Sequence, residues 1–121
     1  MTAKQAWLDS DDEILITILD KTKIDTDNPI GTPIPFIDNG VTRLALYRQD
    51  NNAEIASSDD DKLTFDNDGN IKIALGDINA NYIAKNRSYE MYIKAFSATK
   101  PKGQTIVHSK RPDSNLSITF N

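Results

Sequence analysis

Histidine and cysteine, two residue types that often do nucleophilic or metal chemistry, are scarce in this sequence. It has one histidine, His108, and no cysteine, which excludes multi-histidine metal sites and thiolate chemistry and leaves a Ser–His–Asp triad as the conventional use of the histidine. His108 lies beside Ser109 at the end of a strand-like run, and the sequence has no nucleophile-elbow pattern. The three glutamates fall in strand-like contexts without a distinguishing neighbour: Glu13, Glu54 and Glu90. We therefore predict that the chain is not an enzyme and has no catalytic residue.

One polar run, DNDGN from Asp66 to Asn70, has the composition of a calcium loop, with carboxylates at alternate positions and a glycine that permits a sharp turn. With Gly69 at the sixth loop position, Thr64 stands at the first and Leu75 at the twelfth, where a carboxylate and a bidentate glutamate are needed. The Asp-Gly step between two alternating runs instead predicts a hairpin turn. We assign no metal site, no cofactor and no cofactor-binding residue.

A second acidic run holds three adjacent aspartates, residues 59–61. These carboxylates must be exposed, because three of them cannot be buried together. A loose divalent-cation site shared between residues 59–61 and 66–68 stays open, since the sequence does not show whether the two loops converge.

Aromatic side chains offer a possible binding surface, because flat rings stack well on sugars and proteins and lose little rotamer entropy. Along residues 88–98, Tyr92 and Phe96 share the strand face opposite Tyr89. One of these faces is expected in the core; the other either binds a second sheet or subunit or is buried within the chain. The candidates are Trp7, Tyr47, Tyr82, Tyr89, Tyr92 and Phe96.

The formal net charge of −4 argues against a nucleic-acid partner, which needs clustered basic residues. The charge is uneven: residues 1–70 sum to −9 and residues 71–121 to +5. If the halves form separate faces, they are complementary and favour head-to-tail association. If their strands interleave, the asymmetry blurs.

The elements that must position these residues are predicted to be strands. Among 121 residues, 15 Asp and 11 Asn stand against 3 Glu, together with 15 Ile and 10 Thr. Asp and Asn favour turns, and β-branched residues suit pleated sheets. We predict an all-β fold with one domain over residues 1–121. No apolar run is long enough for a membrane span and no secretory signal is visible.

Short alternating runs bounded by turn residues predict seven or eight strands of an antiparallel sandwich. The expected strands cover residues 13–19, 41–49, 54–58, 63–65, 71–75, 88–98, 104–110 and 116–120. A short helical turn is predicted at residues 78–84, where the spacing of Ile78, Tyr82 and Ile83 suits a helix.

Two features of the first third of the chain suggest partner surfaces. Leu15 and Leu19 make the second face of the first strand apolar, which predicts a strand covered on both sides or paired with a neighbouring subunit. Residues 20–40 form a long proline-bearing loop, expected to hide an edge strand or to serve as a functional arm, with Ile34, Phe36 and Ile37 as packing anchors.

Residues 71–91 resemble the E-to-F corner of immunoglobulin-like sandwiches. Ile71, Ile73 and Leu75 alternate along one strand, and Tyr89 then stands where the corner tyrosine lies. Met91 replaces the usual cysteine, and the strand from residue 41 has no tryptophan. The resemblance therefore implies an immunoglobulin-like topology and not an antibody-type domain.

The wider layout resembles small β-sandwich modules of tailed-phage virions, such as the N-terminal domain of baseplate upper proteins and related adaptor or fibre-attachment domains. The resembling segments are an acidic stretch leading into Ile14-Leu15-Ile16-Thr17-Ile18, the run from residue 40 to 46, and the strand at residues 89–93. None of these segments carries a functional residue over.

With the resemblance, the uneven charge, the apolar face and the long loop predict a phage or prophage virion protein. It is expected to act as an adaptor or tail-associated structural module through protein–protein contacts, as a homo-oligomer or with other virion proteins, after assembly in the host cytoplasm. No nucleic-acid or membrane partner is expected. The alternative is a carbohydrate-binding or adhesion module that uses Trp7 and exposed tyrosines.

Overall fold

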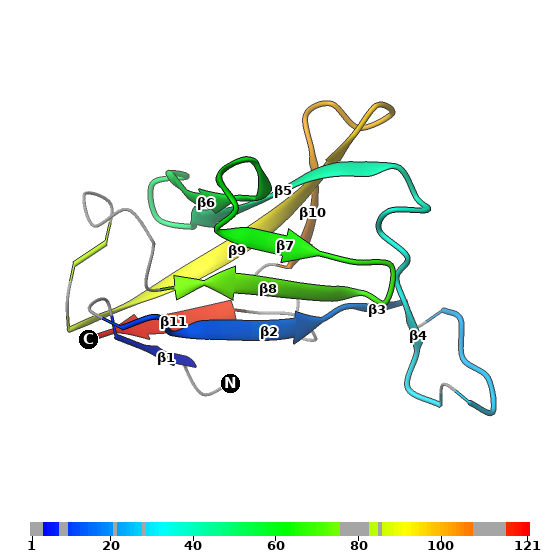
Figure 1. Cartoon of the computed structure of the whole chain (residues 1–121), viewed down its shortest axis with the longest axis horizontal. Coiled ribbons are helices and arrows are strands. Elements are labelled where there is room, and N and C mark those ends of the chain that lie inside the picture. The colour runs from blue at the N-terminus through cyan, green and yellow to red at the C-terminus, as the bar shows by residue number, and fades with distance from the viewer. Residues whose placement is uncertain are drawn as a thin grey trace.

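Two β-sheets lie face to face in the computed structural model of the chain (Figure 1). The structure describes residues 4–7, 10–20, 22–27, 29–75, 83–84, 86–107 and 116–121. These residues form one 3-10 turn, η1 (Ser58–Asp60), and the strands β1 (Lys4–Ala6), β2 (Glu13–Thr17), β3 (Leu19–Asp20), β4 (Thr32–Pro33), β5 (Val41–Arg48), β6 (Glu54–Ser57), β7 (Leu63–Phe65), β8 (Asn70–Ala74), β9 (Arg87–Ser97), β10 (Gln104–Val107) and β11 (Leu116–Phe120). None of the helices in this part of the chain is long and apolar enough to cross a membrane.

The strand order is that of an immunoglobulin-like sandwich. The larger sheet runs β1-β11-β9-β5-β6, with β10 on the same edge of β9 as β11, and the smaller sheet runs β2-β8-β7. β9 therefore lies between β5 on one side and β10 and β11 on the other. This is the central place that strand F holds in the immunoglobulin topology. The pairs within these two sheets are antiparallel except β1 and β11, which are parallel. The all-β sandwich predicted from the sequence is confirmed.

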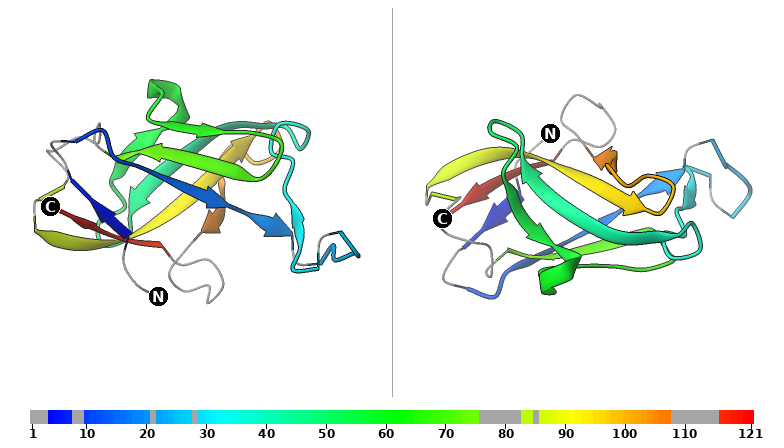
Figure 2. Two further views of the ribbon diagram at one scale, coloured as in Figure 1. Left: turned by 60° about the horizontal axis from the view of Figure 1, so that its bottom comes forward. Right: turned by 90° about the horizontal axis from the view of Figure 1, so that it is seen from above.

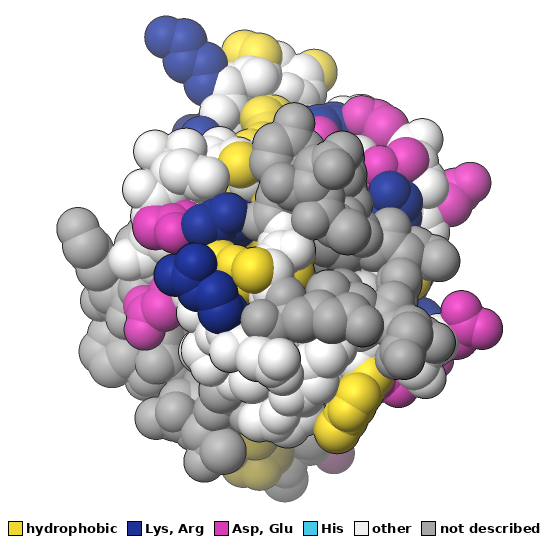
Figure 3. Space-filling model, turned by 90° about the vertical axis from the view of Figure 1, so that its left-hand side faces the viewer, with side chains coloured by type: hydrophobic (Ala, Val, Ile, Leu, Met, Phe, Trp, Pro, Cys, Tyr) yellow, Lys and Arg dark blue, Asp and Glu magenta, His cyan; other side chains and the backbone are white. Residues whose placement is uncertain are grey.

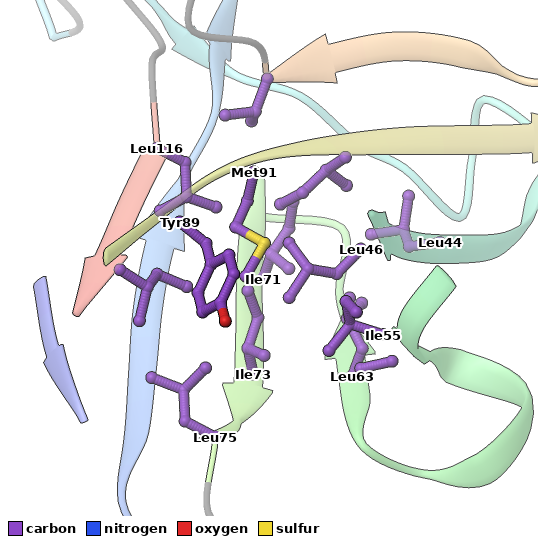
Figure 4. Close-up of a cluster of buried hydrophobic side chains, with 14 of the residues drawn as sticks. Leu44, Leu46, Ile55, Leu63, Ile71, Ile73, Leu75, Tyr89, Met91 and Leu116 are labelled. Atoms are coloured by element: carbon purple, nitrogen blue, oxygen red, sulfur yellow. The ribbon is translucent and has the colours of Figure 1, made fainter. Parts of the chain in front are cut away.

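The core lies between the two sheets, where the alternating residues of each strand point inward. Figure 4 shows Tyr89 and Met91 on β9 lying close to Ile71 and Ile73 of β8, with Leu44 and Leu46 of β5 beside them. The largest side chains with almost no exposed surface are Phe36, Phe120, Leu44, Leu46, Leu63, Ile71, Ile73, Leu75, Met91, Ile93, Leu116 and Ile118.

All eight predicted strands are present, with ends shifted by a few residues. The described chain has three strands beyond the eight that were predicted. β1 and β4 are new, and β3 is separated from β2 at Ile18. The predicted edge strand inside residues 20–40 is real, because Thr32 and Pro33 pair with Asp20 and Leu19. The helical turn predicted at residues 78–84 lies mostly outside the described residues, and residues 83–84 are not helical.

The two halves of the chain interleave. β5 pairs with β9, and β8 lies between β2 and β7, so both sheets combine strands from the two halves of the chain. The uneven charge along the sequence is therefore partly blurred in the folded chain, as expected for interleaved strands.

Candidate functional site

The most prominent surface feature is an arm, defined here as residues 19–33, which contains β3, β4 and the turns between them. Figures 1 and 2 show it projecting from one end of the sandwich. Two large aliphatic side chains on it face solvent: Ile24 is 59% exposed and Ile30 is 72% exposed. Apolar side chains so exposed on a projecting segment are candidates for contact with another molecule.

Polar groups of the arm are used to shape its turns. The Asp20 carboxylate accepts hydrogen bonds from the Thr22 backbone N–H at 3.0 Å and from the Thr22 hydroxyl at 2.5 Å. These two bonds hold the pKa of the Asp20 carboxyl below its ordinary value, and the bond from the Thr22 hydroxyl has the larger effect. The Thr32 hydroxyl donates to the Lys23 carbonyl across the arm. The arm thus folds on its own polar contacts and leaves Ile24 and Ile30 outside.

The base of the arm is tied to the β7–β8 hairpin. The Ile18 N–H donates to the Gly69 carbonyl at 2.8 Å, and the Ile34 N–H donates to the Ile18 carbonyl at 3.1 Å. The Asp38 N–H donates to Asn67 Oδ1 at 2.9 Å, and Asn67 Nδ2 donates to Asp38 Oδ1 at 3.2 Å. The hairpin turn therefore fixes both the entry of the arm and the segment that follows it.

Gly69 is required for this close approach. Its φ of +75° favours glycine, and a Cβ at this position would lie 2.4 Å from the Ile18 carbonyl oxygen and 3.0 Å from the Ile34 nitrogen. Both contacts would be with backbone atoms, which cannot rotate away. The glycine thus allows the turn to touch the arm.

The structure gives the calcium-like run a role in the turn. Asp66 Oδ1 accepts from the N–H of Asp68 at 2.8 Å and of Asn70 at 3.1 Å, and Asp66 Oδ2 accepts from Asn70 Nδ2 at 3.1 Å. Donation from the Asn70 side chain is the main reason that the pKa of Asp66 is lowered. The predicted hairpin turn is confirmed. No three acidic or histidine side chains in the described part of the chain group as metal ligands, and residues 59–61 are exposed as predicted.

Of the three predicted packing anchors after the arm, two pack inward. Phe36 is buried and meets Phe65 edge-on, with ring centroids 6.1 Å apart. Ile34 is half-buried against the core. Ile37 is 55% exposed, so its assignment as an anchor was wrong.

The aromatic residues on the outer face of the larger sheet are engaged within the chain. Tyr47 and Tyr92 stack with centroids 5.0 Å apart and planes within 10°. The Tyr92 hydroxyl donates to Asn52 Oδ1 at 2.9 Å, and burial is the main reason that the pKa of Tyr92 is raised. The Arg43 guanidinium lies 4.9 Å from the centre of the Phe96 ring. Arg43 also binds Glu54 and Asp59.

Tyr89 is a corner tyrosine in geometry as well as in position. Its ring is buried and meets Phe120 edge-on, while its hydroxyl accepts a hydrogen bond from the Ala84 N–H at 2.9 Å. A hydroxyl bonded to backbone a few residues upstream is the defining contact of that motif. Tyr89 thus fastens the start of β9 to the segment before it.

A shallow pocket of about 270 Å³ lies beside Tyr89, lined by Gln49, Asp50, Arg87, Ser88, Tyr89 and Glu90. Arg48 closes over the Tyr89 ring at 4.4 Å and forms an ion pair with Asp50 at 2.5 Å. This pairing lowers the pKa of Asp50 and raises that of Arg48. Figure 3, which views this end of the molecule, shows basic and acidic side chains lying side by side. The charges of Arg48 and Asp50 are therefore neutralised within the chain.

The remaining predicted residues are dispersed. Trp7 is 50% exposed, and its backbone N–H donates to Asp12 Oδ2 at 2.8 Å. His108, Ser109 and Tyr82 lie outside the described residues. Ile24 and Ile30 were not singled out from the sequence. Their only signal there is the presence of large aliphatic side chains in a polar, turn-rich segment without periodicity.

Comparison with known proteins finds no matching family model and no significant match among curated proteins. The roles given to the arm and to the sheet faces rest on the contacts described above.

Proposed function

We propose that this chain is a structural module that assembles with other proteins through its arm, and that the assembly is a phage or prophage virion. The observation that carries the first part is the exposure of Ile24 and Ile30 on a segment whose base is bonded to the sandwich. A fixed base lowers the entropy lost when the arm binds, because the direction of the arm is already set. The resemblance to tailed-phage modules supports the second part.

The chemistry of the arm fits a protein partner with an apolar hollow. Two exposed isoleucines bury enough surface to anchor a contact. The arm also carries three aspartates, at 20, 25 and 27, and two lysines, at 21 and 23. We expect the partner surface to combine an apolar pocket with charged side chains at its rim.

Incorporation into particles tests the proposal. Particles purified from the source strain are analysed by mass spectrometry, once with the natural chain and once with the double substitution Ile24→Asp and Ile30→Asp. The natural chain is expected in the particles, and the double variant is expected to be soluble, folded and missing from them. Thr64→Asp, at an exposed position on β7, is the matched control and should be incorporated.

Two results would contradict the proposal in different ways. If the natural chain is missing from purified particles, the virion assignment is wrong. If the double variant is incorporated as well as the natural chain, the arm is not the contact.

A carbohydrate-binding or adhesion role is the second candidate, and the half-exposed Trp7 favours it. An indole face presented to solvent can stack on a sugar ring. A glycan array probed with the natural chain and with Trp7→Ala separates the two functions, because only a sugar-binding module would lose signal with this substitution.

A further inference from the structure

β2 is an open edge of the smaller sheet. It pairs only with β8, in a register that places Ile14 opposite Ile73 and Ile16 opposite Ile71. The flanking bonds, Leu75 N–H to Asp12 carbonyl and Ile18 N–H to Gly69 carbonyl, belong to the same ladder. The even-numbered residues of this strand are thus the hydrogen-bonded ones.

The odd-numbered residues must then direct their backbone groups away from β8. These are Glu13, Leu15 and Thr17, and none of their N–H or carbonyl groups has a hydrogen bond to any described residue. A row of unpaired donors and acceptors along a strand edge is a template for another strand.

The other edges of the described sheets are protected in ways that β2 is not. β7 has three residues and follows the three exposed aspartates of residues 59–61, β1 has three residues, and β10 carries a register irregularity. β6 has four residues, and its Glu54 is bound to Arg43. β2 has five residues without proline, lysine or bulge.

The side chains along this edge are equally unprotected. Leu15, at its centre, is 63% exposed on the outer face. Ile14 and Ile16 point toward the core but are only partly buried, because no strand lies beyond them in the described part of the chain. Adding a strand would therefore bury apolar surface on both faces.

We propose that this edge pairs with the same edge of a second copy of the chain. In an antiparallel pairing centred on Leu15, Leu15 lies opposite its own copy and Glu13 lies opposite Thr17, so no like charges face each other. Glu13 is already paired with Lys72 of its own chain, with Oε2 and Nζ 3.3 Å apart. The strand is therefore complementary to itself. The two small sheets would join into one sheet of six strands.

A single-cysteine experiment tests this pairing, because the chain has no cysteine of its own. Opposite residues of a hydrogen-bonded antiparallel pair have Cα atoms about 5.5 Å apart, within the range that a disulfide spans. Leu15→Cys is expected to form a covalent dimer of twice 13.5 kDa on mild oxidation. Thr64→Cys, exposed on the same sheet face at its other edge, should stay monomeric. Equal cross-linking of both variants, or none of Leu15→Cys, would overturn the proposal.

Charge exchange at the same position distinguishes a second copy from an unrelated strand. Light scattering of the natural chain at millimolar concentration should give a mass approaching twice 13.5 kDa. Leu15→Lys and Leu15→Glu should each be monomeric, because like charges then lie opposite, and an equimolar mixture should dimerise again. A natural chain that stays monomeric, or a mixture that stays monomeric, would show that the partner is not a second copy. Neither result bears on the arm, so the two proposals fail separately.

Discussion

The arm and the outer face of the larger sheet were both candidates for binding, and they differ in what their side chains already touch. On the sheet face, Tyr92 is buried under Tyr47 and bonded to Asn52, and Arg43 covers Phe96. On the arm, Ile24 and Ile30 are more than half exposed, and the polar side chains around them hold the turns.

The difference shows that residue type alone is a weak guide to a binding surface. Aromatic residues on a strand can satisfy one another across the sheet, because neighbouring strands bring them within stacking distance. An aliphatic side chain on a projecting segment has no such neighbour. Its apolar surface is removed from water only when another molecule covers it.

The largest effect is expected from Gly69→Ala, which disturbs the contact between the hairpin turn and the base of the arm. The new Cβ would meet the Ile18 carbonyl oxygen at 2.4 Å in a left-handed backbone conformation. We expect the free energy of unfolding, measured in urea, to fall by about 2–4 kcal/mol. Gly40→Ala is the matched control: its φ is +81° but nothing lies within 4 Å, so it should lose only about 1–2 kcal/mol. Equal losses would show that the contact with the arm contributes nothing.

A double-mutant cycle on Tyr47 and Tyr92 tests the stacking of these two rings on the outer face of the larger sheet. If the stacked rings serve the fold, Tyr47→Ala and Tyr92→Ala should be coupled by about 0.5–1.5 kcal/mol in the free energy of unfolding. The pair Tyr47→Ala and Ile30→Ala joins the sheet face to the arm and should be additive. Additivity of the two tyrosine substitutions would mean that the stack is not a stabilising unit.

Acid should weaken the hairpin turn that holds the arm. The folded-state pKa of Asp66 is lowered, mainly by the Asn70 side chain, so its contribution to stability is present above the ordinary value of 3.8 and is lost as the pH falls through the folded pKa. Urea unfolding followed from neutral pH downward should show this loss in the natural chain and less of it in Asp66→Asn. Asp20→Asn should alter the profile less, because the hydrogen bonds of the Asp20 carboxylate reach only Thr22. Identical profiles for the natural chain and Asp66→Asn would contradict the account.

The smallest effect is expected from the arm itself. Ile24→Asp and Ile30→Asp should each change the free energy of unfolding by no more than about 0.5 kcal/mol, because both side chains are exposed. A larger loss in thermal or urea unfolding would mean that these isoleucines pack within the chain.

The sheets were predictable because their signals are local. Ile71 and Ile73 alternate with polar residues, and the Asp-Gly step turns the chain between two such runs, so β7, β8 and their hairpin follow from the sequence. The resemblance to the E-to-F corner of immunoglobulin-like sandwiches placed Tyr89 at the corner, and the bond from the Ala84 N–H to its hydroxyl agrees.

The site was less predictable because it depends on contacts between distant segments. The need for Gly69 arises from Ile18 and Ile34, which are far from it in the chain. Ile37 is exposed although its neighbour Phe36 is buried, and the sequence of this segment does not report which of the two side chains points into the core. The stacking of Tyr47 on Tyr92 depends on the register of β5 with β9. No periodicity within one segment reports these relations.

Site-specific photocross-linking tests the central claim most directly. A photoreactive residue is placed at Ile30 or at Tyr47, and the chain is produced in its source strain. The account predicts a covalent adduct with one defined protein from position 30 and none from position 47. An adduct from position 47 with none from position 30 would contradict it.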